Sequence, residues 1–376
     1  MKVPFLDLTR YFSGEREEIY SAVQDTFASG TYLMGERVPA LETELKSAFA
    51  PKGSGGFVCC NSGTDALTLA LLASGVRAGD EVITVSHTAI PTVAAIFAVG
   101  GIPVLMDVHP ATWVMDPKAL PAHISKKTRA IIIVHLYGNA VPYPSIERIL
   151  KECGREDISI IEDAAQAMGT TVGGVPVGTS ARFGAYSFFP TKNVGAFGDG
   201  GAVYCRDPED EVTVRSLRFY GQKVRGEVSI PRGINSRLDE LQAAVLRVRL
   251  KYFAKRQAEK TLLMRRYREA LSGKRISFQE VAEATSPAWH LCVICAERDE
   301  DRDDLKKFLS SRGIECMIHY PLPNHLQLGF GLSGTSLPVT ESLVGKILSL
   351  PFFSGMQEDE QLYIIESINQ FLSCAV

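Results

Sequence analysis

The chain has 376 residues, which is enough to bury a large hydrophobic core and to form two domains. Apolar residues make up 45% of it and charged residues 22%, a composition ordinary for a soluble protein. The formal net charge is -3, and acidic and basic residues are mixed along the chain. No basic face therefore indicates binding to nucleic acid or to a membrane surface, and we expect the partner to be a small molecule.

Targeting signals and redox signals are weak in this sequence. The apolar run before Asp7 is too short for a signal peptide, and the longest apolar stretch, residues 89–107, is interrupted by prolines and glycines. We therefore expect a cytoplasmic protein. The C-x-x-C pair, Cys292 and Cys295, lies in a strand-like run in which residues three apart face opposite sides. Buried thiols are the expectation there, since neither a zinc site nor a redox turn suits this spacing.

The first part of the chain alternates between helical and strand-like patterns. Residues 5–50 read as two helices with a glycine-containing break at 29–35, because Leu41, Leu45 and Phe49 fall at helical spacing. Beyond them, this rhythm predicts an α/β fold with a mostly parallel sheet that is covered on both faces. The predicted strands are 56–60, 81–85, 103–107, 130–136, 158–161, 183–188 and 201–205, and the predicted helices between them are 66–73, 91–99 and 145–153.

A candidate anion site follows the first of these strands. The turn Ser62-Gly63-Thr64 stands between a buried strand and an apolar helix. Free N–H groups and the helix dipole both favour an anion at such a place, and a phosphate fits it. An ordinary turn capped by Ser62 or Thr64 explains the same residues equally well.

Two further loops carry residues that complete one type of chemistry. Asp163 stands at the end of a buried strand, where ligands collect in parallel sheets, and Lys192 follows Ser187 in a glycine-rich stretch. A pyridoxal phosphate enzyme needs a lysine for the aldehyde, donors for the phosphate and a carboxylate against the pyridine nitrogen. Taken singly, Lys192 fits a solvated loop and Asp163 fits a helix cap; together with the Ser62–Thr64 turn they favour a pyridoxal phosphate site.

With these residues in view, the chain resembles the DegT/DnrJ/EryC1/StrS family of sugar aminotransferases, which have the fold of the aspartate aminotransferase superfamily. The motifs that carry the resemblance are residues 32–35, 61–67, 162–166, 187–201, 235–244, 313–314 and 319–325. The resemblance implies a large cofactor-binding domain, 1–245, and a smaller α+β domain, 246–376. It also implies a homodimer whose active sites are shared between the subunits.

The resemblance assigns roles to individual residues. Lys192 is similar to the lysine that holds the cofactor as a Schiff base and then moves the proton, and Asp163 to the partner of the pyridine nitrogen. Gln166 resembles a contact to the ring hydroxyl, and Asn235 the residue that reaches the phosphate from the other subunit. The residues that resemble the phosphate cup are Ser62, Gly63, Thr64 and Ser187.

The implied reaction is a transamination in two halves, from L-glutamate to a keto sugar linked to a nucleotide. The motif at 235–244 favours relatives that act on 3-keto-6-deoxy sugars carrying thymidine diphosphate. Two rival functions stay open: a sugar dehydratase on the same scaffold, and a regulatory protein that binds the cofactor without turnover. Dehydratases of this kind commonly carry histidine at the position of Lys192, which argues against the first rival.

Two features depart from the family pattern. Ala89 stands where many relatives carry an aromatic residue over the cofactor ring, so ring stacking falls to His87 or to another residue, although a histidine beside a strand end is more often structural. The loop 221–233 lacks the histidine and tyrosines of some relatives that use nucleotide sugars. Since that loop is expected to meet the substrate, these changes bear on substrate identity.

The last third of the chain predicts shorter elements. Ser236 and Asp239 resemble a capping box that opens one long helix, 238–271, whose basic residues at 247–260 are expected to face solvent. His319 and His325 lack a carboxylate or cysteine at ligand spacing, so a proline-flanked turn explains them better than a metal site. The remaining predicted elements are strands 289–295 and 315–319 and helices 302–312 and 358–373.

Overall fold

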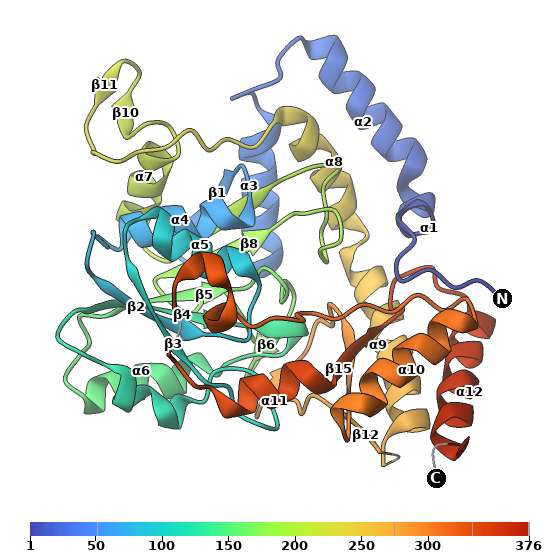
Figure 1. Cartoon of the computed structure of the whole chain (residues 1–376). Coiled ribbons are helices and arrows are strands. Elements are labelled where there is room, and N and C mark those ends of the chain that lie inside the picture. The colour runs from blue at the N-terminus through green and yellow to red at the C-terminus, as the bar shows by residue number, and fades with distance from the viewer. Residues whose placement is uncertain (51, 274, 333, 375–376) are drawn as a thin grey trace.

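A computed structural model describes residues 1–50, 52–273, 275–332 and 334–374. The described residues form a seven-stranded sheet in the order β1-β9-β8-β5-β4-β2-β3 (Figure 1). All of these strands run in the same direction except β9, which pairs antiparallel with β1 and β8. The strands are β1 Gly56–Cys60, β2 Glu81–Val85, β3 Ile102–Met106, β4 Thr128–Val134, β5 Ser159–Asp163, β8 Phe183–Ser187 and β9 Gly201–Cys205.

The predicted mostly parallel α/β fold is confirmed. Strands β1, β5 and β9 are buried along their whole length, because helices cover both faces of the sheet and exclude water from each apolar run. Figure 1 shows the helices around the sheet and α2 extending away from it. The helices of this part are α1 Leu8–Tyr11, α2 Arg16–Ser29, α3 Arg37–Phe49, α4 Gly63–Ala73, α5 Ile90–Ala98, α6 Tyr143–Glu152 and α7 Pro208–Leu217.

A second sheet organises the C-terminal part of the chain. Its order is β12-β14-β15, all antiparallel, and it has an apolar core of its own that includes Tyr267, Ile294 and Ile364. The division of the chain into domains near residue 245 remains a prediction. The elements are α8 Glu240–Lys251, α9 Phe253–Leu271, β12 Ile276–Phe278, β14 Cys292–Ala296, α10 Asp299–Ser311, α11 Pro338–Lys346, β15 Ile347–Leu350 and α12 Glu358–Cys374.

Short pairs of strands complete the described structure. A hairpin, β10 and β11, projects from the end of α7 (Figure 1). A small sheet of order β13-β6-β7 joins two strands that follow β5 to one that follows β12. These strands are β6 Thr171–Val172, β7 Val175–Pro176, β10 Gln222–Val224, β11 Glu227–Val228 and β13 Thr285–Ser286. Among the described residues, no helix combines the length and the apolar character that crossing a membrane requires.

Three expectations about the C-terminal elements were wrong. The long helix is two helices, because the chain breaks at Tyr252 between α8 and α9. Ser236 does not cap α8, since its hydroxyl donates to Asp65 and accepts from the Asn61 N–H instead. The expected strand 315–319 makes only a single bridge, between Met317 and Ser349.

The prediction that the basic residues of α8 and α9 face solvent was wrong at three positions. Arg249 is fully buried, and Arg256 and Lys260 are only 3% and 4% exposed. Glu15, from the N-terminal segment, forms ion pairs with both arginines, and the aromatic rings of Tyr11 and Phe12 cover the Arg249 guanidinium. The face predicted to be exposed to solvent is therefore buried at these positions: the two arginines contact the N-terminal segment, and Lys260 contacts Asn193 and the His290 carbonyl.

Candidate active site

A cavity of about 240 Å³ opens where the parallel strands end. Its wall is built from the loops that follow β1, β2, β4, β5 and β8, which is where ligands collect in sheets of this kind. It brings together seven of the residues that the sequence singled out, from segments far apart in the chain. These seven are Ser62, Gly63, Thr64, Asp163, Gln166, Ser187 and Lys192.

The first wall of the cavity is the beginning of α4. Ser62 is the N-cap, and its hydroxyl accepts a hydrogen bond from the Asp65 N–H at 3.1 Å. The predicted cap is therefore present, and it uses the Asp65 N–H. The N–H groups of Gly63 and Thr64 lie in the first turn of α4, where the helix supplies no acceptor for them. A Cβ added to Gly63 would stand 2.7 Å from the Cβ of Ser187, so only glycine fits here. The helix dipole and these donors suit a phosphate beside Ser187.

Asp163 and Lys192 lie on the same cavity. Asp163 is 5% exposed, and burial raises the pKa of its carboxyl above the ordinary value, although hydrogen bonds and Lys192 oppose this. Lys192 is half-buried in the cavity wall, yet protein atoms surround it closely enough that desolvation lowers its pKa to about 8, against the attraction of Asp163. A substantial fraction of Lys192 is then a neutral amine near pH 8, which is the nucleophilic form.

Gln166 is held at both ends of its amide. Its Oε1 accepts from the Tyr137 N–H at 3.0 Å, and its Nε2 donates to the Tyr320 hydroxyl at 2.9 Å. An amide nitrogen carries two hydrogens, so one remains for a ligand. Tyr320 comes from the C-terminal part of the chain and was not found from the sequence, because nothing local connects it to Gln166.

The neighbour of Asp163 has a structural role. Glu162 is 1% exposed; its Oε2 accepts from the Ser180 and Ala181 N–H groups, and its Oε1 faces the Nε2 of His135 at 3.2 Å. Because the Val141 N–H donates to Nδ1 of His135, the ring proton lies on Nε2 and points to Glu162. His135 lines the cavity and was not predicted as a site residue, although its place near the end of a predicted strand, 130–136, was a usable signal.

Ala89 and His87, the two residues considered for ring stacking, lie in different surroundings. Ala89 lines the cavity, whereas His87 does not. His87 is 1% exposed, its Nε2 lies 3.0 Å from the Tyr137 hydroxyl, and burial lowers its pKa to about 4. His87 is therefore a neutral, buried residue, and ring stacking does not fall to it.

His319 and His325 serve different contacts. His319 stacks on Phe5 and its Nδ1 lies 2.9 Å from the Ser349 hydroxyl. His325 is buried, with Nδ1 at 2.7 Å from the Ser86 hydroxyl and Nε2 at 3.2 Å from Glu341. Within the described residues no group of three or more His, Cys, Asp or Glu side chains could hold a metal ion.

Asn235 is the one predicted site residue that lies outside the cavity. Its side chain is exposed, and its Oδ1 accepts from Arg237 Nε at 2.9 Å. The next residue, Ser236, is fully buried; it accepts from the Asn61 N–H at 3.1 Å and donates to Asp65 at 2.7 Å. The chain around Asn235 is therefore fixed to Asn61 and Asp65, on either side of the Ser62–Thr64 turn of the same chain, while the Asn235 side chain is exposed.

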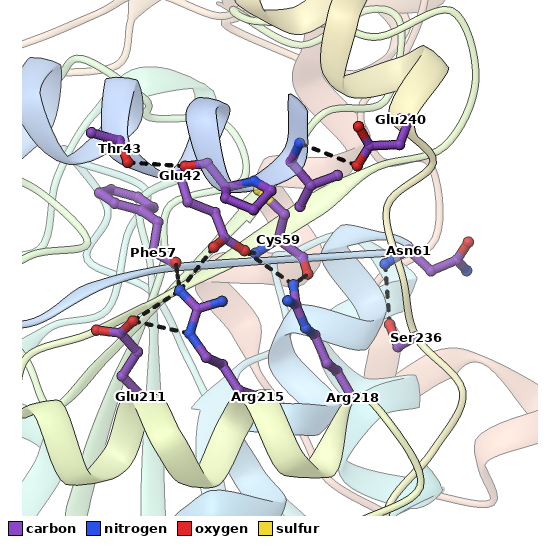
Figure 2. A network of polar contacts seen from close by, with 12 residues as sticks. Glu42, Thr43, Phe57, Cys59, Asn61, Glu211, Arg215, Arg218, Ser236 and Glu240 are labelled. Carbon is purple, nitrogen blue, oxygen red and sulfur yellow. Dashed lines mark hydrogen bonds and ion pairs between the residues drawn. The ribbon is translucent and has the colours of Figure 1, made fainter. Parts of the chain in front are cut away.

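A polar network behind β1 holds this region in place (Figure 2). Glu42 is 6% exposed; it accepts from the Cys59 N–H at 2.8 Å and pairs with Arg215 at 2.8 Å and Arg218 at 3.0 Å. Glu240, fully buried, accepts from three N–H groups at the start of α3, at 2.8 to 3.3 Å. Anchored in this way, β1 delivers the Ser62–Thr64 turn to the cavity.

The residues of the cavity fit pyridoxal phosphate. The α4 N-terminus and the Ser187 hydroxyl form an anion cradle that a larger residue at position 63 would fill. Asp163 supplies a buried carboxylate, and Lys192 supplies an amine of lowered pKa on the same wall. This set of groups matches a phosphate, a pyridine nitrogen and an aldehyde.

Comparison with known proteins gives a consistent result. The model of the DegT/DnrJ/EryC1/StrS aminotransferase family matches residues 14–369. The chain is 40% identical to the erythromycin biosynthesis sensory transduction protein EryC1 of Saccharopolyspora erythraea, over 98% of this chain and 99% of that protein. It is 38% identical to the dTDP-3-amino-3,4,6-trideoxy-alpha-D-glucose transaminase of Streptomyces venezuelae, over 98% of this chain and 96% of that protein.

Solved structures agree with the sequence comparisons. DesV of S. venezuelae, solved in complex with a ketimine intermediate, has a TM-score of 0.93 and 37% identity, covering 99% of this chain and 98% of its own. The pyridoxal phosphate form of the putative sugar aminotransferase Spr1654 of Streptococcus pneumoniae has a TM-score of 0.88 and 26% identity, covering 96% of this chain and 97% of its own.

Proposed function

The chain belongs to the DegT/DnrJ/EryC1/StrS aminotransferase family, and we propose that it uses pyridoxal phosphate to transfer an amino group from L-glutamate to a nucleotide-linked keto sugar. One observation carries this: Lys192 and Asp163 share a cavity with an anion cradle at the start of α4. When bound, the cofactor supplies the aldehyde that carries the amino group and the ring that withdraws electrons from the reacting carbon.

The residues of this chain have separate tasks in the proposed reaction. The N–H groups of Gly63 and Thr64, with the Ser187 hydroxyl, bind the phosphate. Asp163 would hold the proton on the pyridine nitrogen, and the Nζ of Lys192 would take the proton from the donor's α-carbon as general base and give it to the cofactor's aldehyde carbon as general acid. An Asp163→Asn variant is expected to retain the cofactor and lose transamination by at least about a hundredfold, because an amide lacks the charge that holds the proton.

For the substrate, we propose a 3-keto-6-deoxy hexose on thymidine diphosphate. The name of the S. venezuelae relative supports this, since that enzyme acts on a dTDP-linked 3-amino sugar. The test is incubation with ¹⁵N-glutamate and a panel of dTDP-linked and UDP-linked keto sugars, followed by mass measurement of the products. A ¹⁵N-amino sugar formed by the wild-type chain and not by Lys192→Ala supports the proposal, and the panel names the sugar.

A regulatory protein that binds the cofactor is the second candidate, because EryC1 is named a sensory transduction protein. A catalyst converts glutamate to 2-oxoglutarate in the first half of the reaction and changes the cofactor's absorption band as it does so. A protein that merely binds the cofactor leaves both unchanged. The presence of Lys192 rather than histidine argues against a dehydratase.

We propose also that the protein is a cytoplasmic homodimer in which Asn235 serves the partner's cavity. The exposed side chain of Asn235, outside its own cavity, supports the shared site. Lys192→Ala and Asn235→Asp homodimers should both be nearly inactive, the second because its carboxylate repels the phosphate. After the two are unfolded together and refolded in equal amounts, roughly a quarter of wild-type sites should return, since about half of the dimers are mixed and each has one intact site.

The control is a native mass measurement that shows mixed dimers to be present. Without recovered activity in that sample, Asn235 serves its own chain or none, and the shared site is wrong. The assignment of Lys192 is independent of that result.

A further inference from the structure

A hydroxyl group that has no task in the proposed reaction contacts Asp163. Thr92, in the first turn of α5, donates through Oγ1 to Oδ2 of Asp163 at 2.9 Å. Its Oγ1 also lies 2.9 Å from Oγ1 of Thr88. When Asp163 is ionised, its carboxylate only accepts, so the single proton of Thr92 then points to Asp163 and Thr88 is the donor in the second contact. The two hydroxyls therefore form a chain that runs from Thr88 through Thr92 to Asp163.

Both hydroxyls are buried, and the turn that carries Thr88 is held by a side chain from a distant segment. Thr92 and Thr88 are 1% and 3% exposed. Asn324, 1% exposed, donates through Nδ2 to the backbone oxygens of Ser86 at 3.0 Å and Thr88 at 2.8 Å. Asn324 belongs to the orange-red segment that lies beside α5 in Figure 1. The turn that carries Thr88 is thus clamped between β2 and a segment from the other end of the chain.

The hydrogen bond from Thr92 affects the charge state of Asp163. Burial raises the pKa of Asp163, and the Ala165 N–H, the Thr92 hydroxyl and the Lys192 ammonium oppose that rise. His135 and Tyr320 are the other titratable groups that interact with it. The positive N-terminal end of α5 also favours a carboxylate beside its first turn. Without the Thr92 hydroxyl, the carboxyl loses one of the few groups that stabilise its charge in a buried position.

We propose that Thr92, with its hydroxyl oriented by Thr88, is the positioning residue that keeps the Asp163 carboxylate ionised and fixed at the cavity wall. This rests on the proposed function in one respect, the task of Asp163 at the pyridine nitrogen. A protonated Asp163 would present an O–H group there and could not hold the ring proton by charge. The ionisation itself is a property of the protein and is measurable apart from turnover.

The test compares Thr92→Val, which keeps the shape and removes the hydroxyl, with Thr92→Ser, which keeps the hydroxyl. The full-length chain is labelled with ¹³C at the aspartate carboxyls and titrated by NMR, and the Asp163 signal is identified by its loss in Asp163→Asn. In Thr92→Val the titration of Asp163 should move upward by about 1 to 2 pH units, the effect of losing one hydrogen bond to a charged group. Thr92→Ser should titrate near wild type.

A second readout is the affinity of the full chain for pyridoxal phosphate as a function of pH. The loss of affinity on the acid side should begin at a higher pH in Thr92→Val, by the same displacement. Thr84→Val is the matched control: Thr84 is fully buried on β2, and its hydroxyl donates to the Ile132 carbonyl at 3.0 Å rather than to Asp163. That variant loses a buried hydroxyl and should leave both titrations in place.

Titrations of Thr92→Val that coincide with those of Thr84→Val would overturn the proposal, because Thr92 then only fills space. If Thr92→Val does not fold, as judged by circular dichroism, Thr88→Val decides. It leaves the Thr92 proton free to turn away, so it should raise the titration of Asp163 by a smaller amount, and an unchanged titration would overturn the proposal. A chain that shows these shifts and transaminates no sugar would contradict the proposed function alone.

Discussion

Lys260 is a buried lysine whose charge the fold does not neutralise, and its removal gives a pH-dependent prediction. Its Nζ donates to Oδ1 of Asn193 and to the His290 carbonyl, both at 3.2 Å, and lies 5.1 Å from the centre of the Phe352 ring. None of these groups is a carboxylate. Burial, with a contribution from Arg256, lowers the pKa of Lys260 from 10.5 to about 7.

The direction of the effect follows from the protons that each state binds. Between pH 7 and 10.5 the unfolded chain carries a proton on Lys260 that the folded chain lacks, so the free energy of unfolding rises with pH across this window. Below pH 7 both states are charged, and the folded state bears the full cost of the buried ammonium. From pH 7 to pH 9 this group should add about 2 kcal/mol to the stability of the wild type.

Lys260→Met removes this dependence, so its stability relative to wild type should fall by that amount between pH 7 and pH 9. The assay is urea unfolding of the full chain at both values. Lys255→Met, on the exposed side of α9, is the control and should differ from wild type equally at both. An equal difference for Lys260→Met at the two pH values would refute the account, since Lys260 would then titrate alike in the folded and unfolded states.

Two further substitutions test the framework of the site. Gly63→Ala should weaken pyridoxal phosphate binding by about tenfold or more, because the new Cβ must displace Ser187. In the control, Gly14→Ala, the new Cβ has nothing within 4 Å, and this variant should bind the cofactor as wild type does. Equal affinities in the two variants would contradict the anion cradle at Gly63. Glu240→Gln should cost about 2 kcal/mol in urea unfolding, because a buried carboxylate that accepts three N–H groups is lost. Glu44→Gln, at a half-exposed ion pair, should cost less than about 1 kcal/mol, and a similar loss in both variants would contradict the capping role.

The strands of the large sheet could be predicted because a parallel strand covered on both faces is a short, uninterrupted apolar run. The cavity followed from the same logic, since Asp163 and Lys192 lie at or just beyond strand ends and such ends meet at one edge of the sheet. Asp163's partner Thr92 was not predicted. It lies 71 positions away, in a helix that the sequence places correctly, and only the packing of α5 brings the two together.

The exposure of the basic residues was predicted wrongly because their partners, like Thr92, are distant in sequence. Arg249 and Lys260 stand among basic residues that resemble a solvated helix face, yet the partners that enclose them are distant in sequence. Glu15 is 234 positions from Arg249, and Asn193 is 67 positions from Lys260. Ser236 likewise has the spacing of a capping residue, and Asn61 and Asp65 use its hydroxyl instead. Local spacing reports which bonds a side chain can form, and tertiary contacts decide which it does form.

The central claim is that Lys192 is the lysine that holds the cofactor. Borohydride reduction of the yellow holoprotein, followed by digestion and mass mapping, tests it directly, because reduction fixes the cofactor to the amine that carries it. The account predicts that the label lies on Lys192, and that Lys192→Ala still binds the cofactor through its phosphate but gives no labelled lysine. Lys260 is the most informative competitor, since it too is an amine of lowered pKa. A label on Lys260, or on any lysine other than Lys192, would contradict the account.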